Sequence, residues 1–190
     1  DESKLVTLEI GKKGEDGKYF ARDGSSRVVA TIDAGLSDDL DKGLKNFRAS
    51  RLLEIAAYEV TGFDVSSEGV TRTFTKSTTK GKDGLDEILW KSAAPTKDVS
   101  QDQASDAFFS VGAIDAAEFI DTPRPLVAYG LDAPTLRVTL RFDGDKKEDW
   151  LEVAVKGEGA FGRRRGDASV LKLDRTKTEA LIKTFTSLGS

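Results

Sequence analysis

The sequence has no histidine, no cysteine and no methionine among its 190 residues. Histidine is the usual general base near neutral pH and the commonest protein ligand of transition metals, so its absence argues against most hydrolase and zinc-enzyme mechanisms. The absence of cysteine excludes disulfides, thiolate metal sites and cysteine nucleophiles, and it fits either redox compartment. Because methionine is also absent, we expect that Asp1 is not a translation start and that the chain is a processed form or a piece of a longer protein.

A long apolar run and an excess of basic residues are also lacking. No stretch approaches the roughly 20 apolar residues that a membrane span requires, and there is no signal-peptide pattern. The net charge is −4 with both signs interspersed, whereas a nucleic-acid-binding protein normally carries a concentrated basic surface. With 38% hydrophobic and 33% charged residues, the composition is typical of a folded globular protein.

The clearest pattern lies between Tyr129 and Phe185. Residues 135–142 alternate strictly between apolar and polar side chains, which is typical of a half-buried strand in an antiparallel sheet. Residues 150–155 resume the alternation after a turn, so the two segments predict a hairpin. We predict two further strands, at residues 161–165 and 169–173. A helix that opens with a capping box of Thr176 and Glu179 completes this stretch.

The start of the chain shows the same pattern in shorter form. We predict three strands, at residues 5–10, 19–22 and 27–32. A helix with Ser37 as its N-cap follows them, and its apolar stripe consists of Leu36, Leu40, Leu44 and Phe47. In a gapped alignment, residues 8–10 match 151–153, residues 20–22 match 161–163 and residues 28–29 match 170–171. We interpret the match as an internal repeat.

The middle of the chain contains similar elements. Alternation predicts strands at 59–65, 70–76 and 87–91, and Trp90 is predicted to anchor the core. Ser100 and Gln103 have the spacing of a capping box, and they open a helix whose apolar face consists of Ala104, Ala107, Phe108 and Val111. After a short strand at 118–120, the proline-containing segment 122–125 is the best candidate for a boundary.

These elements indicate an α+β fold of antiparallel sheets, each covered by a helix, in repeated ββ(β)βα units. We predict three parts. Residues 1–53 are the C-terminal part of a preceding repeat module, residues 54–122 form a βββα module, and residues 123–190 form a ββ(β)βα module that begins with the Tyr-Gly-Leu motif.

Several motifs, taken together, span nearly the whole chain. They are Ala128-Tyr129-Gly130-Leu131-Asp132-Ala133-Pro134 before an alternating strand, a Trp90 strand that ends at Ala94-Pro95, the strand Tyr19-Phe20-Ala21-Arg22, and the segment 47–53. In these motifs the sequence resembles a bacterial family, the DUF4340 domain. The family's Tyr-Ala-Arg pattern becomes Phe161-Gly162-Arg163 in the second copy, which is a departure from it.

The resemblance implies repeated modules behind an N-terminal membrane anchor that is absent from this chain, on the extracytoplasmic (periplasmic) side. It also implies protein partners, ABC-transporter subunits among them, an accessory role in transport or gliding motility, and neither cofactors nor established catalytic residues. We therefore expect a non-catalytic structural or interaction module. Its candidate interaction or structural residues are Tyr129, Gly130, Leu131, Pro134, Tyr19, Arg22, Arg163 and Trp90.

Two alternatives stay open. One is a domain that binds a small ligand or a glycan in a pocket between modules near residues 123–129. The other is an enzyme that works with carboxylates alone, as glycosidases do, which requires an Asp/Glu pair in a cleft.

Other motifs favour structural interpretations. Residues 157–162 match G-x-G-x-x-G, but a strand follows them, so we expect a glycine-rich hairpin bend. Arg163 and Arg165 share one strand face and Arg164 points away, as in a solvated strand edge. Ser77 and Lys80 match S-x-x-K without a helix start. The acidic clusters at 143–149 and 83–87 lack EF-hand spacing, so we expect turn solvation, with weak calcium binding as the alternative. Trp90 and Trp150 are expected in the core, with a stacking platform as the alternative.

Overall fold

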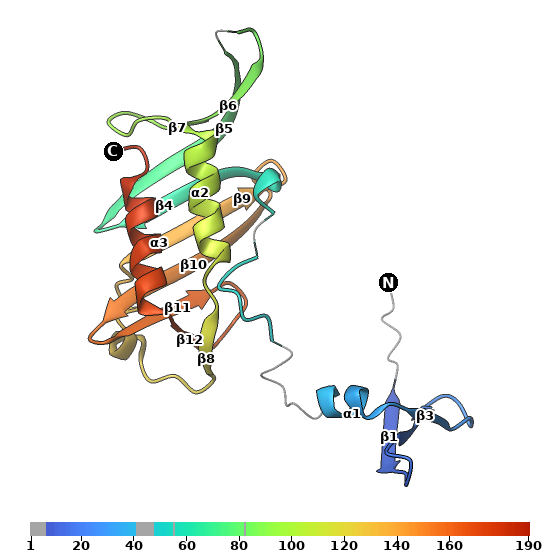
Figure 1. Ribbon diagram of the computed structural model, residues 1–190. Coiled ribbons are helices and arrows are strands. Elements are labelled where there is room, and N and C mark those ends of the chain that lie inside the picture. Colours follow the sequence, from blue (N-terminus) through green and yellow to red (C-terminus); the bar gives the residue numbers. More distant parts are fainter. Residues whose placement is uncertain (1–6, 41–47, 55, 82) are drawn as a thin grey trace. The chain divides into compact units, whose positions relative to one another are not determined.

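The computed structural model describes residues 7–40, 48–54, 56–81 and 83–190. The chain divides into two compact units, Asp1–Ala49 (unit 1) and Ser50–Ser190 (unit 2), both shown in Figure 1. Antiparallel strands dominate and a few helices accompany them, so the predicted α+β class is confirmed. Leu44 and Phe47 of the predicted helix stripe lie outside the described residues, as do residues 5 and 6 of the first predicted strand.

Unit 1 is a three-stranded antiparallel sheet followed by a short helix. Its strands are adjacent in chain order, and the elements are β1 (Leu8–Lys13), β2 (Tyr19–Asp23), β3 (Ala30–Ile32) and α1 (Ala34–Leu40). α1 begins before the predicted N-cap Ser37, which lies inside the helix. Ala21 is the one buried residue among the described residues of this unit.

Unit 2 contains a nine-stranded antiparallel sheet with the order β7-β6-β5-β4-β9-β10-β11-β12-β8. Its first half consists of a 3-10 turn η2 (Ala57–Glu59), β4 (Val60–Ser67), β5 (Val70–Lys80), β6 (Asp86–Lys91), β7 (Val99–Ser100), α2 (Gln101–Gly112) and β8 (Ala116–Ile120). Its second half consists of a 3-10 turn η3 (Leu126–Tyr129), β9 (Leu136–Phe142), β10 (Lys147–Lys156), β11 (Gly159–Arg164), β12 (Val170–Leu173) and α3 (Arg175–Ser187).

Two meanders meet in the middle of this sheet. β4 to β7 run outward to one edge and lead into α2, while β9 to β12 run toward the other edge and lead into α3. β4 and β9 pair with each other, with Val65 opposite Val138. The predicted modules 54–122 and 123–190 are therefore parts of one sheet, and the boundary between compact units falls at Ala49 instead of residue 53. Sequence periodicity identifies strands but not their neighbours, so it could not show this pairing.

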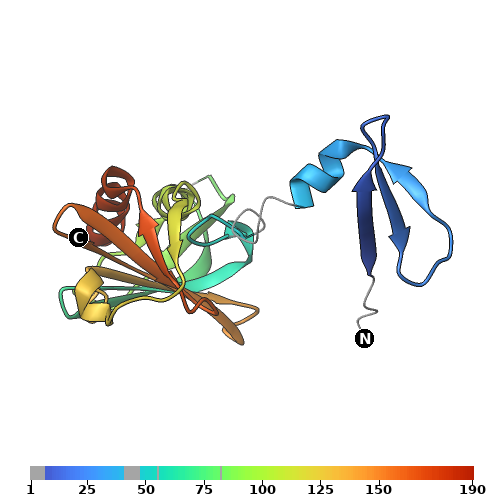
Figure 2. The same cartoon turned by 90° about the horizontal axis from the view of Figure 1, so that it is seen from below.

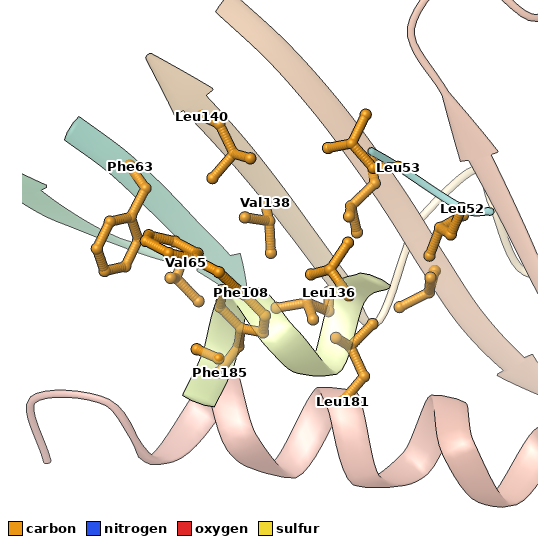
Figure 3. Close-up of a cluster of buried hydrophobic side chains, with 14 of the residues drawn as sticks. Leu52, Leu53, Phe63, Val65, Phe108, Leu136, Val138, Leu140, Leu181 and Phe185 are labelled. Atoms are coloured by element: carbon orange, nitrogen blue, oxygen red, sulfur yellow. The ribbon is translucent and has the colours of Figure 1, made fainter. Parts of the chain in front are cut away.

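Both α2 and α3 lie on the same face of the nine-stranded sheet, in place of the predicted single helix per sheet (Figures 1 and 2). The core fills the layer between them and the strands. The inward residues of β9 are Leu136, Val138 and Leu140, as predicted, and all three are fully buried. Figure 3 shows them facing Leu181 and Phe185 of α3. The residues predicted to line α2 are its buried ones, Ala104, Ala107, Phe108 and Val111.

An aromatic cluster forms one part of this core. Phe63 stacks on Phe74 with ring centroids 4.7 Å apart, and it meets the edges of Trp90 and Phe108 at 5.1 and 5.2 Å. The indole nitrogen of Trp90 donates a hydrogen bond to Gln101 Oε1 at 3.0 Å. Such aromatic pairs stabilise a core beyond the burial of their area. Trp90 is thus fully buried and has a partner for its polar atom.

The helix starts were predicted with mixed success. The Ser100–Gln103 capping box is confirmed, since the Ser100 hydroxyl accepts from the Gln103 amide and the Gln103 side chain accepts from the Ser100 amide. The Thr176–Glu179 box is wrong, because Asp174 is the N-cap of α3 and Thr176 lies inside the helix. Asp is as good an N-cap as Ser or Thr, so two acceptable caps close together in sequence could not be ranked.

The two tryptophans provide a matched test of this core. Trp90→Ala should lower the free energy of unfolding of the full chain by about 3–5 kcal/mol, because it leaves a cavity in the aromatic cluster. Trp150→Ala should cost clearly less, since Trp150 is only partly buried and lies on the other face of the sheet. Urea unfolding followed by far-UV circular dichroism measures both changes. Equal losses for the two variants would contradict the core described here.

Candidate binding face on the uncovered side of the sheet

The face of the nine-stranded sheet opposite α2 and α3, called the open face below, carries a row of three charged residues. Arg137 on β9, Glu152 on β10 and Arg163 on β11 lie directly opposite one another in register. Arg137 Nη1 donates to Glu152 Oε1 at 3.0 Å, and Arg163 Nη1 lies 3.6 Å from Glu152 Oε2. These residues point to this face because they alternate with the buried Leu136 and Val153.

Trp150 lies beside this row on the same face. The guanidinium carbon of Arg137 is 5.0 Å from the centroid of its ring, and that of Arg163 is 5.7 Å away. Both distances are within the range in which a cation is attracted to an aromatic ring. The row and the indole therefore form one charged and aromatic surface, to which three neighbouring strands contribute.

Glu152 is the unusual member of the row. Its side chain is only 9% exposed, whereas those of Arg137 and Arg163 are 45% and 30% exposed. Glu152 Oε2 is buried and accepts no hydrogen bond, although it lies near Arg163. A buried carboxylate oxygen without a hydrogen-bond donor costs free energy, and the guanidinium of Arg163 is the cation that lies nearest to it.

A hollow of about 630 Å³ adjoins the row. One wall is the turn between β4 and β5, from Ser66 to Gly69, and the other is the segment from Leu131 to Thr135. The side chains of Arg137, Glu152 and Arg163 form its floor. The hollow thus lies between parts of the chain that were predicted as separate modules, although its second wall begins at Leu131, just beyond the predicted 123–129.

The Tyr-Gly-Leu segment is packed against the same face. Figure 2 shows η3 on the side of the sheet opposite the two long helices. Tyr129 and Leu131 are buried in a small cluster with Ala154 and Val170, and the Tyr129 ring meets Phe161 at 5.0 Å. The Tyr129 hydroxyl accepts a hydrogen bond from the backbone amide of Arg124 at 3.1 Å. This motif therefore fixes one wall of the hollow.

Gly130 and Pro134 complete that wall. Gly130 ends η3 with a φ of +73°, which favours glycine, and a Cβ there would lie 3.4 Å from Cβ of Ala154. Pro134 lines the hollow two residues before β9 begins. The sequence profile of the family described as Domain of unknown function (DUF4340) matches residues 1–134, which is more than half of the chain and ends at this proline.

The chain belongs to the DUF4340 family. None of the curated proteins and none of the solved structures compared with this DUF4340 chain matched it. The family's description names no activity, so the geometry of the open face has to carry the functional argument.

The other predicted site residues do not join this face. Tyr19 and Arg22 belong to β2 of unit 1, where Arg22 pairs with Glu9 and the Tyr19 ring lies near the ammonium of Lys13. Trp90 lies in the core. Among the predicted residues, Arg163 belongs to the charged row and Tyr129, Gly130, Leu131 and Pro134 belong to the wall.

The remaining motifs are explained by local structure. The G-x-G-x-x-G segment forms the turn between β10 and β11 at residues 157–158 and the first four residues of β11, with Gly157 at a φ of +58°. Arg164 points to the helix side, where its guanidinium lies over the ring of Phe119 and pairs with Asp167. In the β9–β10 turn, Asp143 and Asp145 have positive φ angles, as glycine-like turn positions do.

The acidic residues of this turn region are engaged with basic partners. Asp145 pairs with Arg141, and Glu148 pairs with Arg165. Burial raises the pKa of Asp149, against the opposing effects of a hydrogen bond from the Trp150 amide and of nearby arginine charges. Within the described ranges, no three acidic side chains come close enough to hold a metal ion.

Sequence reasoning missed Arg137 and Glu152 as site residues, and it considered Trp150 only in the alternative of a stacking platform. Alternation did place Arg137 on the polar face of its strand, and Glu152 follows the same rule. Their convergence depends on the register of β9, β10 and β11, which the alternation does not specify.

Glu152→Gln tests the row. It keeps an acceptor for Arg137 but removes the charge between two guanidinium groups, so we expect the free energy of unfolding to fall by about 1–3 kcal/mol. Glu158→Gln is the matched control, because Glu158 is fully exposed in the neighbouring turn, and it should change stability by less than about 0.5 kcal/mol. Urea unfolding of the full chain measures both. A neutral Glu152→Gln would show that the row is an ordinary surface ion pair.

Proposed function

We propose that this chain is a non-catalytic interaction module that binds a protein partner through the open face of its nine-stranded sheet. The observation that carries the proposal is the row in which the partly exposed guanidinium groups of Arg137 and Arg163 flank the buried Glu152 beside the Trp150 indole. Arginine and tryptophan are enriched among residues that dominate protein interfaces. A partner that supplies a carboxylate to the exposed parts of Arg137 and Arg163 would form charge-assisted hydrogen bonds with them.

The biological setting is part of the proposal. We propose that the module belongs to an extracytoplasmic, membrane-anchored protein that assists an ABC-type transport or motility complex, and that its units arose by repetition of one ββ(β)βα element. Support for the setting comes from the motifs that resemble the family, including Tyr129-Gly130-Leu131. Across the described residues no helix combines the length and hydropathy of a membrane span.

Affinity capture tests the partner and its surface together. The intact protein, solubilised under mild conditions, should recover transporter subunits, and Trp150→Ala should reduce the recovery at least about tenfold if the indole is an interface hot spot. Arg175→Ala is the control, because Arg175 belongs to α3 on the opposite face and pairs locally with Glu179. Recovery of no transporter subunit would overturn the setting. Equal recovery by Trp150→Ala and the unmodified protein would overturn the role of the open face.

The hollow favours a second function, the binding of a small anionic or glycan ligand. Its floor offers two guanidinium groups and a carboxylate, and Trp150 lies beside them for stacking on a sugar ring. In a thermal-shift screen of sugar acids, a ligand at 100 times its dissociation constant should add about 2.7 kcal/mol of stability. The shift should disappear in Arg163→Ala and persist in Arg175→Ala. A screen without any such shift would remove this candidate.

A further inference from the structure

Unit 1 repeats the strand register of the second half of unit 2. In β1 and β2, Glu9 lies opposite Arg22 and Ile10 opposite Ala21. In β10 and β11, Glu152 lies opposite Arg163 and Val153 opposite Gly162. The next strand continues the correspondence, since Ala30 lies opposite Ala21 as Leu171 lies opposite Gly162. By this register Val29, and not Val28 as in the sequence alignment, corresponds to Val170.

The same local pattern has different surroundings in the two units. In unit 2 the second edge of β10 pairs with β9, which supplies Arg137 to Glu152. In unit 1 the second edge of β1 pairs with no strand among the described residues. The Glu9 side chain is accordingly 48% exposed and has an ion pair to Arg22. β1 thus presents an edge that no described strand covers, where its counterpart has a partner.

Unit 1 also contains residues that correspond to the apolar cluster against which the Tyr-Gly-Leu segment packs in unit 2. In unit 2, Ala154, Phe161 and Val170 form the small cluster that receives Tyr129 and Leu131. The corresponding residues of unit 1 are Gly11, Phe20 and Val29, and they line an open hollow of about 360 Å³. Phe20 is 47% exposed and Val29 is 57% exposed. A sheet of this size with one buried residue among those described has too little core to be stable alone.

We propose that unit 1 binds a segment of another protein module that carries Tyr-Gly-Leu-x-x-Pro followed by an alternating apolar and basic strand. The tyrosine and leucine fill the hollow at Phe20 and Val29, and the strand adds to that edge of β1 by β-augmentation. Its first arginine reaches Glu9, as Arg137 reaches Glu152 in unit 2. This binding is independent of the open face of unit 2, and it extends beyond the function proposed above.

A fluorescent synthetic copy of residues 126–142 is the probe, added to the full chain and followed by anisotropy. We expect saturable binding that Phe20→Asp and Val29→Lys each weaken at least about tenfold. Phe109→Asp is the matched control on unit 2, where Phe109 is 80% exposed, and it should leave binding unchanged. Circular dichroism checks that each variant keeps its strands.

Variants of the peptide provide a second test, which does not depend on whether a variant of the protein folds. The peptide with Tyr129→Ser should bind at least about tenfold more weakly. The peptide with Arg137→Glu should lose binding to the unmodified chain and regain it with Glu9→Lys, because the charges are exchanged. Absence of binding, or equal binding by these peptides, would overturn the proposal. Dimerisation of the chain that Phe20→Asp abolishes would also overturn it, because it would identify a second copy as the occupant.

Discussion

The antiparallel pairing of β4 with β9 is the constraint on which the rest of unit 2 depends. Each four-stranded meander alone would leave a long strand with one unpaired edge, which is a template for association. Their pairing, with Phe63 opposite Leu140 and Val65 opposite Val138, removes both edges at once. It also makes one surface on which α2 and α3 lie together, and the opposite face is left without either helix.

The open face acquires its chemistry from the same arrangement. Once Leu136, Leu151 and Val153 turn toward the helices, their alternating neighbours Arg137 and Glu152 must turn away. Desolvation offsets most of the attraction within a partly buried row of charges, so the intact row contributes little net stability, although removing the charge of one member alone is costly. Stability therefore does not explain why Glu152 lies between two arginines. The proposed binding of a partner to Arg137 and Arg163 would explain it.

Much of the fold could be predicted because its signals are local. The alternation in 135–142, the capping box at Ser100 and the apolar stripe of α2 each depend on neighbouring residues alone, and the structure contains all three. Pairings between distant segments could not be predicted in this way. Nothing in the periodicity of β4 specifies β9 as its neighbour, so one sheet was interpreted as two modules. The site was missed for the same reason, since Arg137, Glu152 and Arg163 converge only through sheet register.

Residues Ser50–Ser190 form one cooperative unit around a single sheet, whereas the described strands of unit 1 lack the cover that their counterparts have. Hydrogen exchange of the full chain, resolved by peptide mass spectrometry, tests both parts directly. The account predicts that amides of β4 and β9 exchange together and most slowly, through global unfolding, and that amides of β1 exchange far faster than those of β10. Separate exchange of β4 and β9, or protection of β1 equal to that of β10, would contradict it.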